Sequence, residues 1–187
     1  YVVQQINSRQ ASLNLSGVKL SFEIYDSCGT IGTALQQTLR LLAPKNGTAA
    51  SAVIGEEGSS VTIPVANLLQ LFHVPQISFF STTPSLSDKS QYGYFVRTCP
   101  SDSFQARALV DIVNHFNWSY VVAIHSSDIY GQAGIKAFID NFHNVTLNRC
   151  VADGSIEIPY PRAEASDYDA AVSKLAAPYV SNATVIV

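Results

Sequence analysis

Apolar runs alternate with amphipathic stretches along most of the chain. Short runs rich in Val, Ile, Leu and Phe predict strands, and apolar residues that recur at helical spacing predict helices between them. The predicted strands are 18–25, 52–55, 76–80, 94–98, 120–125, 149–152 and 183–187, and the predicted helices are 31–43, 59–72, 103–116, 131–143 and 166–179. This alternation is typical of an α/β fold built on doubly wound parallel sheets.

The sequence Cys-Pro-Ser-Asp at 99–102 predicts a crossing between two α/β arrays. Proline restricts the backbone there, and either Ser101 or Asp102 is placed to cap the helix that follows. The arrays would be 1–98 and 103–187, facing each other across a cleft. Ligands favour clefts between domains, so the cleft is where we expect the functional site.

A strand–turn–helix unit in the first array predicts an anion site. The apolar strand 52–55 is followed by a turn that contains Gly58, and a helix opens at Ser59 and Ser60. Such a junction directs free backbone N–H groups and the positive end of the helix dipole into one crevice. Ser59 is the candidate N-cap, which is the usual role of a serine at this place. Gly58 would allow a ligand to approach the backbone closely.

Thr82, Asp102 and Tyr130 each follow the carboxyl end of a predicted strand, which is where open α/β sheets bind their ligands. Asp102 would accept a charge-assisted hydrogen bond from an ammonium group, and Tyr130 would place its ring face against the same charge. Each residue also has a structural alternative, namely a helix cap for Asp102 and packing for Tyr130. A carboxylate site together with an acidic and an aromatic partner for an amine predicts a receptor for an α-amino acid.

Composition and motifs exclude several other functions. The 187 residues are 47% hydrophobic and 13% charged, with a net charge of -3 and no basic run, so a nucleic-acid partner is not expected. The motifs Gly-x-Ser-x-Gly, His-Glu-x-x-His and Gly-x-Gly-x-x-Gly are absent, so we expect neither an enzyme nor a cofactor or metal ion. The first residues resemble the end of a helix and the last lie in an apolar strand, so we expect a fragment of a longer protein.

Five sequons of the form Asn-x-Ser/Thr predict a glycosylated protein on the extracellular side. They begin at Asn14, Asn46, Asn117, Asn144 and Asn182.

The three cysteines are Cys28, Cys99 and Cys150. In an oxidising compartment an odd number predicts a bonding partner outside this segment. We expect Cys99 and Cys150 to be buried free thiols.

Several longer stretches resemble the extracellular module of class C G-protein-coupled receptors, and metabotropic glutamate receptors most closely. They are NLLQLFHVPQI at 67–77, LSDK at 86–89, PSDSFQARA at 100–108, NWSY at 117–120 and YGQAG at 130–134. The resemblance implies a bilobed clamshell of the periplasmic-binding-protein type, of which this chain holds part of each lobe.

The resemblance also implies roles for individual residues. Ser59, at the helix start it shares with Ser60, would take the ligand α-carboxylate, Thr82 would hold carboxylate and amine, Asp102 would take the ammonium, and Tyr130 would lie over it. Two positions depart from the pattern of glutamate receptors, which carry Ser where this chain has Gly58 and Phe80. Both changes touch the wall of the implied pocket.

As a whole, the resemblance implies an extracellular sensor at the cell membrane that binds an L-α-amino acid, glutamate first among them, and signals to a G protein through a seven-helix domain outside this chain. The alternative is a soluble transport-type amino-acid-binding protein with the same clamshell. Cys28 would pair with an upstream cysteine outside the fragment. A homodimer would form through an apolar stripe on two helices of the first lobe, made of Leu35, Leu39, Leu68, Leu71 and Phe72.

Overall fold

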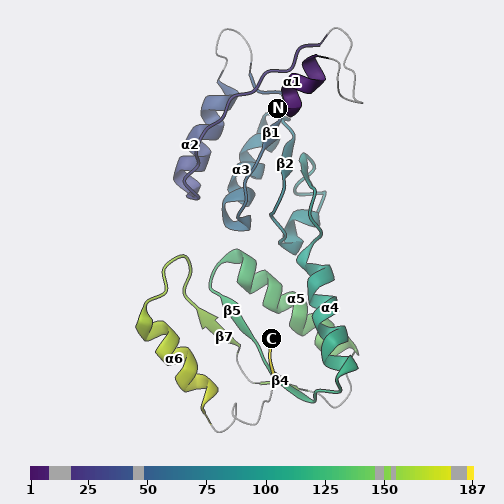
Figure 1. Ribbon diagram of the computed structural model, residues 1–187, viewed down its shortest axis with the longest axis vertical. Coiled ribbons are helices and arrows are strands. Elements are labelled where there is room, and N and C mark those ends of the chain that lie inside the picture. Colours follow the sequence, from purple (N-terminus) through teal and green to yellow (C-terminus); the bar gives the residue numbers. More distant parts are fainter. Residues whose placement is uncertain (9–17, 44–48, 146–149, 153–154, 178–184) are drawn as a thin grey trace.

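The protein folds as two α/β halves stacked along the long axis of the molecule (Figure 1). The computed structural model describes residues 1–8, 18–43, 49–145, 150–152, 155–177 and 185–187. Every strand pair within these ranges is parallel, as the alternation of strands and helices predicts.

The first half contains a three-stranded sheet in the order β1-β2-β3, and two of its helices share a core cluster with Val53 of the sheet. Its elements are α1 (Val2–Asn7), α2 (Ile31–Leu42), β1 (Val53–Ile54), α3 (Ser59–Leu71), β2 (Gln76–Ser78), the 3-10 helix η1 (Pro84–Ser87) and β3 (Phe95–Arg97). α2 and α3 contact each other, and their buried apolar side chains form one core cluster. The members are Ala34, Leu42, Val61, Val65 and Leu69.

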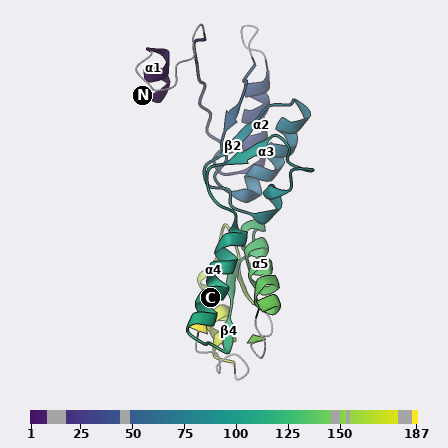
Figure 2. The same ribbon diagram turned by 90° about the vertical axis from the view of Figure 1, so that its right-hand side faces the viewer.

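The second half holds two parallel sheets, one in the order β6-β4-β8 and one that pairs β5 with β7. Its elements are α4 (Asp102–His115), β4 (Tyr120–Val122), β5 (Ile124–Ser126), α5 (Ile129–Val145), β6 (Cys150–Val151), β7 (Ile156–Ile158), α6 (Ala165–Leu175) and β8 (Val185–Ile186). Figure 1 and Figure 2 both show α4 and α5 side by side, and the two helices are in contact.

Two adjacent residues of β4 show that the second half is doubly wound. Successive side chains of a strand point to opposite faces of the sheet. Val121 packs in the cluster formed with α4 and α5, whereas Val122 packs in the cluster that includes Ala171 of α6. Helices therefore cover both faces, and a strand buried on both faces reads as the continuous apolar run seen in the sequence.

One predicted strand is wrong. Residues 18–25 alternate apolar and polar side chains, yet no strand forms there. The backbone N–H and C=O of Leu20 bond instead to the side-chain amide of Asn7, each at 2.8 Å. Phe22 and Ile24 are 66% and 83% exposed, so the described residues do not cover the apolar side of this segment.

The sequence also missed one strand and misplaced three helix starts, among them that of α6, which begins one residue before its predicted start. β7 has Glu157 between its two isoleucines, so it does not form the continuous apolar run by which the other strands were predicted. α4 begins one residue before its predicted start, at Asp102, and α5 begins two residues before its own, so Tyr130 lies in the first turn of a helix and not in a loop. These shifts matter because both residues belong to the predicted site.

We expect Gly131→Ala to destabilise the protein. A Cβ atom at Gly131 would collide with the backbone and Oγ of Ser126, whereas a Cβ at Gly134 on the same helix would meet no atom within 4 Å. The expected loss is about 2 kcal/mol, or about 4–8 °C in unfolding temperature. Thermal unfolding of both variants tests this, because Gly134→Ala should be neutral or slightly stabilising. Equal effects of the two substitutions would contradict the close approach at Gly131.

Candidate functional site

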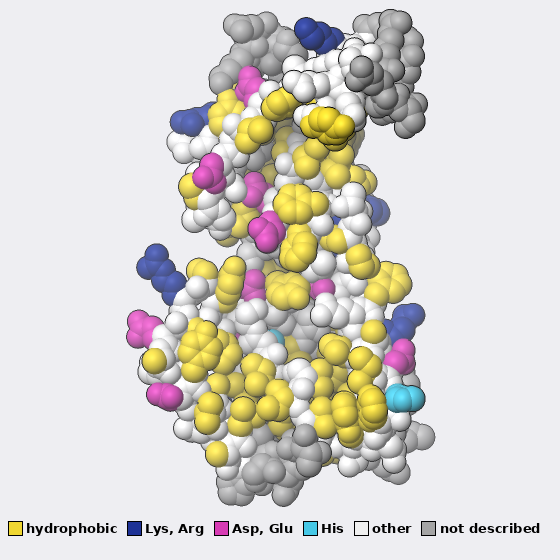
Figure 3. Space-filling view, viewed as in Figure 1, with side chains coloured by type: hydrophobic (Ala, Val, Ile, Leu, Met, Phe, Trp, Pro, Cys, Tyr) yellow, Lys and Arg dark blue, Asp and Glu magenta, His cyan; other side chains and the backbone are white. Residues whose placement is uncertain are grey.

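The segments that follow the carboxyl ends of β1, β2, β3 and β5 meet where the two halves touch. The backbone N–H of Thr83 donates to Ser59 Oγ at 3.3 Å, and the backbone N–H of Asp102 donates to the carbonyl of Thr82 at 2.9 Å. Across the boundary, α3 contacts α5. Figure 3 shows acidic side chains along this boundary.

The first turn of α3 differs in detail from the prediction. Gly58 is the N-cap, with ordinary extended dihedrals, and Ser59 is the first helical residue. The predicted capping role of Ser59 is therefore wrong. Its side chain is 3% exposed, and its Oγ accepts from the loop after β2. Ser59 thus holds together the start of α3 and the loop that contains Thr82.

Buried hydroxyl groups fix the turn that precedes α3. Ser78 Oγ donates to the carbonyl of Glu56 at 2.7 Å, and Ser81 Oγ donates to the carbonyl of Glu57 at 2.8 Å. Both serines are fully buried. Since buried polar groups specify one arrangement when their hydrogen bonds are satisfied, this network holds the strand–turn–helix junction in place.

Arg97 at the end of β3 supports the same loop from behind. Its Nη1 donates to the carbonyls of Ser81 and Thr83 at 3.1 and 2.9 Å, and its Nη2 donates to Ser87 Oγ at 2.5 Å. Sequence reasoning missed this arginine, because a single basic residue at a strand end carries no recognisable signal.

Asp102 is the most unusual polar group of the site. Ser101 caps α4 by accepting from the N–H of Ser103 at 3.3 Å, so the carboxylate of Asp102 is not used as the cap. Asp102 is 4% exposed, and among the described residues its buried Oδ2 has no hydrogen-bond partner. Burial raises the pKa of Asp102, against the lowering effects of a hydrogen bond with the Thr82 side chain and the charge of Arg97. A buried carboxylate oxygen with no donor is a place where an ammonium group fits.

Tyr130, the second residue of α5, lies close to two carboxylates. Its side chain is 43% exposed. Burial raises the pKa of its hydroxyl, and the negative charges of Asp102 and Asp128 raise it further. The hydroxyl therefore stays protonated at neutral pH, and the ring lies in a region of negative potential that attracts a cation.

One pocket of about 240 Å³ brings together Asp102 and Tyr130, the two residues predicted for the amine. It lies between α4, α5 and β5, and its other lining side chains are mainly apolar. The other predicted site residues do not line it. These are Gly58, Ser59, Ser60, Thr82 and Phe80. Thr82 contacts the start of α4 through its carbonyl, and Ser60 contacts Asp128 before α5.

Neighbouring atoms do not enclose either of the two positions that depart from the glutamate-receptor pattern. A Cβ at Gly58 would meet no atom within 4 Å, so glycine is not required there by packing. Phe80 is 62% exposed, although it follows β2 only two residues before Thr82.

The five residues of the predicted dimer stripe divide into two groups. Leu39, Leu71 and Phe72 are 50%, 75% and 53% exposed. Leu35 and Leu68 instead pack against the core between α2 and α3. Another apolar residue of α3 is also used inside the chain, since Ile63 packs on a separate cluster around Leu86 and Phe95.

The cysteines agree only in part with the expectation of buried thiols. Cys99 is half-buried, but Cys150 is exposed, so its predicted burial is wrong. Cys150 stands on β6, a short strand that pairs with one side of β4. Cys28 is exposed and carries a free thiol. Within the described ranges, no group of three or more His, Cys, Asp or Glu side chains is placed to hold a metal ion.

Among the predicted sequons, Asn117 lies on the surface after α4. Asn14, Asn46 and Asn182, and the side chain of Asn144, lie outside the described residues.

A family model described as the receptor family ligand binding region matches residues 1–187. The chain belongs to this family. Its parallel α/β halves agree with the periplasmic-binding-protein-like fold class predicted from the sequence.

Curated relatives are metabotropic glutamate receptors. The chain is 38% identical over 180 residues to metabotropic glutamate receptor 4 of Macaca fascicularis, covering 86% of this chain and 19% of the relative. It is 40% identical over 164 residues to the Rattus norvegicus protein of the same name, covering 78% and 18%. A metabotropic glutamate receptor of Drosophila melanogaster is 36% identical over 198 residues, covering 94% and 20%.

The chain therefore spans about a fifth of the length of the curated relatives it matches. The resemblance to the ligand-binding part of class C receptors is confirmed, and so is the expectation of a receptor in place of an enzyme. In the part of the chain that the structure describes, no helix has the length and apolar character needed to cross a membrane.

Proposed function

We propose that this chain is part of an extracellular sensor domain that binds an L-α-amino acid between its halves, 1–98 and 103–187, which join at 99–102. The observation that carries the proposal is the buried Oδ2 of Asp102, which has no partner among the described residues and lies in one pocket with Tyr130. An ammonium group would supply both the missing hydrogen-bond donor and a counter-charge.

The α-carboxylate would lie at the start of α3. The first turn of a helix offers N–H donors and a positive dipole end. Ser59 and Thr82 belong to the segments that meet there, and Thr82 also interacts with Asp102, so one small ligand would reach both ends of the site. This arrangement supports an α-amino acid as the ligand class.

L-glutamate is the first candidate because the relatives are named metabotropic glutamate receptors. By the same resemblance, the whole protein would be a glycosylated homodimer at the cell membrane, would bond Cys28 to an upstream cysteine, and would act on a G protein through a seven-helix domain.

A thermal-shift panel of L- and D-amino acids on the complete ectodomain tests the ligand class. A ligand that binds only the folded state at 100 times its Kd stabilises it by about 2.7 kcal/mol, or roughly 5–10 °C here. We expect L-glutamate to give such a shift and D-glutamate a smaller one. If no L-α-amino acid changes the unfolding temperature, the proposed function is wrong.

We expect Phe80→Ser to improve the binding of glutamate relative to apolar amino acids. Serine restores a hydroxyl and room for water where the phenyl ring now stands, and a hydrogen bond to a charged ligand contributes about 1.5–3 kcal/mol. Calorimetry with an amino-acid panel gives the ranking. Phe79→Ser is the matched control, because Phe79 is similarly exposed, at 54% against 62% for Phe80. An unchanged ranking in Phe80→Ser would remove Phe80 from the site.

A further inference from the structure

We infer that Asp128 is a positioning residue that fixes Tyr130 and ties the second half of the molecule to the first. This inference rests on the proposed function, because it assigns a task within the same site. Three observations carry it, namely the cap of α5, the close approach of Gly131, and a contact across the boundary between the halves.

The first observation is the cap of α5. Asp128 immediately precedes the helix, and its Oδ1 accepts from the N–H of Gly131 at 3.1 Å and from the hydroxyl of Ser126 at 2.5 Å. An aspartate at this place satisfies a free N–H group and is stabilised by the helix dipole. Since Tyr130 lies two residues further along the chain, the cap fixes the turn from which its ring projects.

Gly131 makes the same turn rigid. Its Cα packs so closely on Ser126 that no side chain fits, so the end of β5 and the start of α5 are held against each other. The turn therefore has little freedom to rotate Tyr130 independently of β5.

The third observation is a contact between the halves. The hydroxyl of Ser60, in the first turn of α3, donates to Oδ2 of Asp128 at 3.5 Å. One carboxylate thus contacts both helix starts, with one oxygen on α5 and the other on α3. The proposed carboxylate end of the site and the proposed amine end are joined through Asp128.

This geometry predicts a coupling between closure and ligand affinity. Asp102 and Asp128 both lie near Tyr130 in the second half, where their like charges add to the negative potential around its ring. A ligand ammonium beside Asp102 offsets part of that potential, and the contact between Ser60 and Asp128 holds the start of α3 in the first half against the same site. Asp128 was not singled out from the sequence, because an aspartate at a helix start ordinarily indicates only a cap.

Two substitutions separate the contact from the cap. Ser60→Ala removes the hydroxyl that crosses the boundary and leaves α5 unchanged. Asp128→Ser keeps a good N-cap for Gly131 but is too short to reach Ser60. In calorimetry of the complete ectodomain with L-glutamate, we expect each variant to bind about tenfold more weakly, which corresponds to ~1.4 kcal/mol. The double variant should bind no more weakly than either single variant, because both remove the same interaction.

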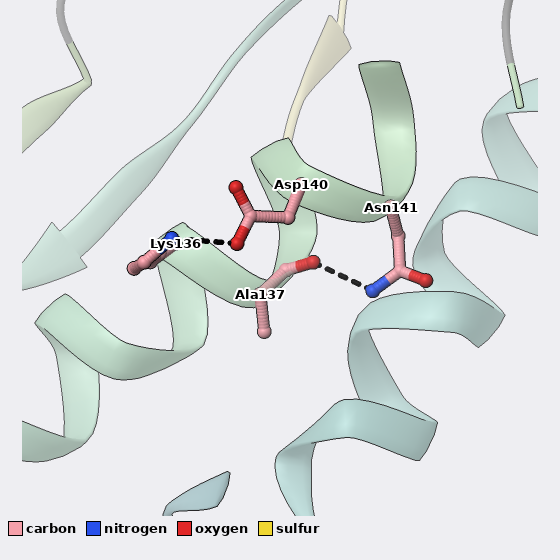
Figure 4. Close-up of polar contacts among 4 residues, drawn as sticks. All are labelled: Lys136, Ala137, Asp140 and Asn141. Carbon is pink, nitrogen blue, oxygen red and sulfur yellow. Dashed lines mark hydrogen bonds and ion pairs between the residues drawn. The ribbon is translucent and has the colours of Figure 1, made fainter. Parts of the chain in front are cut away.

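The matched control is Asp140→Ser, within α5. Asp140 pairs with Lys136 at 2.7 Å on the exposed face of α5, next to the bond between Asn141 and the carbonyl of Ala137 (Figure 4). This variant loses the same charge from α5 and should bind like the wild type. Wild-type affinity in Ser60→Ala or Asp128→Ser, or multiplied effects in the double variant, would overturn the inference.

A second measurement separates this inference from the proposed function. If the wild type binds no amino acid, the proposed function is wrong, and the contact is then tested without a ligand. A double-mutant cycle on thermal unfolding of Ser60→Ala and Asp128→Ser should then be non-additive, whereas the cycle of Ser60→Ala with Asp140→Ser should be additive. Additivity in the first cycle would show that the two side chains do not interact.

Discussion

Replacing Asp102 with Asn is expected to weaken ligand binding by about 30-fold or more, equivalent to ~2 kcal/mol, and at the same time to raise the unfolding temperature of the unliganded ectodomain. Binding is lost because the ligand ammonium loses its counter-charge. The protein is stabilised because Asp102 is a buried carboxylate whose Oδ2 has no donor among the described residues. A gain of about 1 kcal/mol would raise the unfolding temperature by roughly 2–4 °C.

The pH dependence of this gain follows from the raised pKa of Asp102. The pKa of Asp102 is higher in the folded state than in the unfolded state. Its contribution to folding stability is therefore fully present at a pH below the unfolded-state pKa, and it is lost as the pH rises through the folded-state pKa. Asp102→Asn should therefore be more stable than the wild type at pH 7, and the difference should vanish at a pH below 3.8, the ordinary value for this group.

Calorimetry and thermal unfolding of the same samples check both parts of this prediction. Asp111→Asn is the control, because Asp111 lies on the same helix and is exposed. It should change neither affinity nor stability. Unchanged affinity in Asp102→Asn would show that this carboxylate does not hold the ligand.

The double substitution Leu39→Asp and Leu71→Asp is expected to convert the proposed homodimer of the ectodomain to folded monomers. Both leucines are exposed on the helices α2 and α3, at 50% and 75%. An apolar interface core excludes charge, so two carboxylates there would have to be desolvated without partners. We expect at least a hundredfold weaker association, or about 2.7 kcal/mol, seen as a halved mass in light scattering.

Two further substitutions show whether the effect belongs to this surface. Ile112→Asp places the same charge on an exposed apolar position of α4, which is 45% exposed, and should leave the dimer intact. Leu68→Asp should instead reduce stability, because Leu68 packs against the core between α2 and α3. A dimer that persists after Leu39→Asp and Leu71→Asp would place the interface elsewhere.

The alternation of apolar runs and amphipathic stretches was sufficient to predict the parallel architecture. The reason is visible at Val121 and Val122, which are buried on opposite faces of the sheet and therefore leave no polar position in the run. The same reasoning failed for 18–25. Its alternation satisfies the pattern of a strand, but a strand also needs a partner, and the pattern within one segment says nothing about its neighbour.

The sequence predicted that Asp102 and Tyr130 belong to one site, but it did not predict which residues of the site contact each other. Asp102 and Tyr130 were placed in one site because both follow strand ends, and the structure brings them into one pocket. The roles of Ser101, Gly58 and Ser59 as cap or helix residue could not be separated, because adjacent residues at a helix start have similar capping propensities. The contact of Ser60 with Asp128 spans 68 positions and depends on how the halves meet.

Recognition of the ligand ammonium is tested by two ligands that differ only at the α-position. L-glutamate and 2-oxoglutarate share a carbon chain and both carboxylates, but 2-oxoglutarate has no ammonium group. In calorimetry of the complete ectodomain, we expect L-glutamate to bind once per protomer and 2-oxoglutarate to bind at least ~30-fold more weakly, because it lacks the ammonium group proposed to lie beside Asp102 and Tyr130. Equal binding of the two compounds, or no binding of any L-α-amino acid, would contradict this expectation.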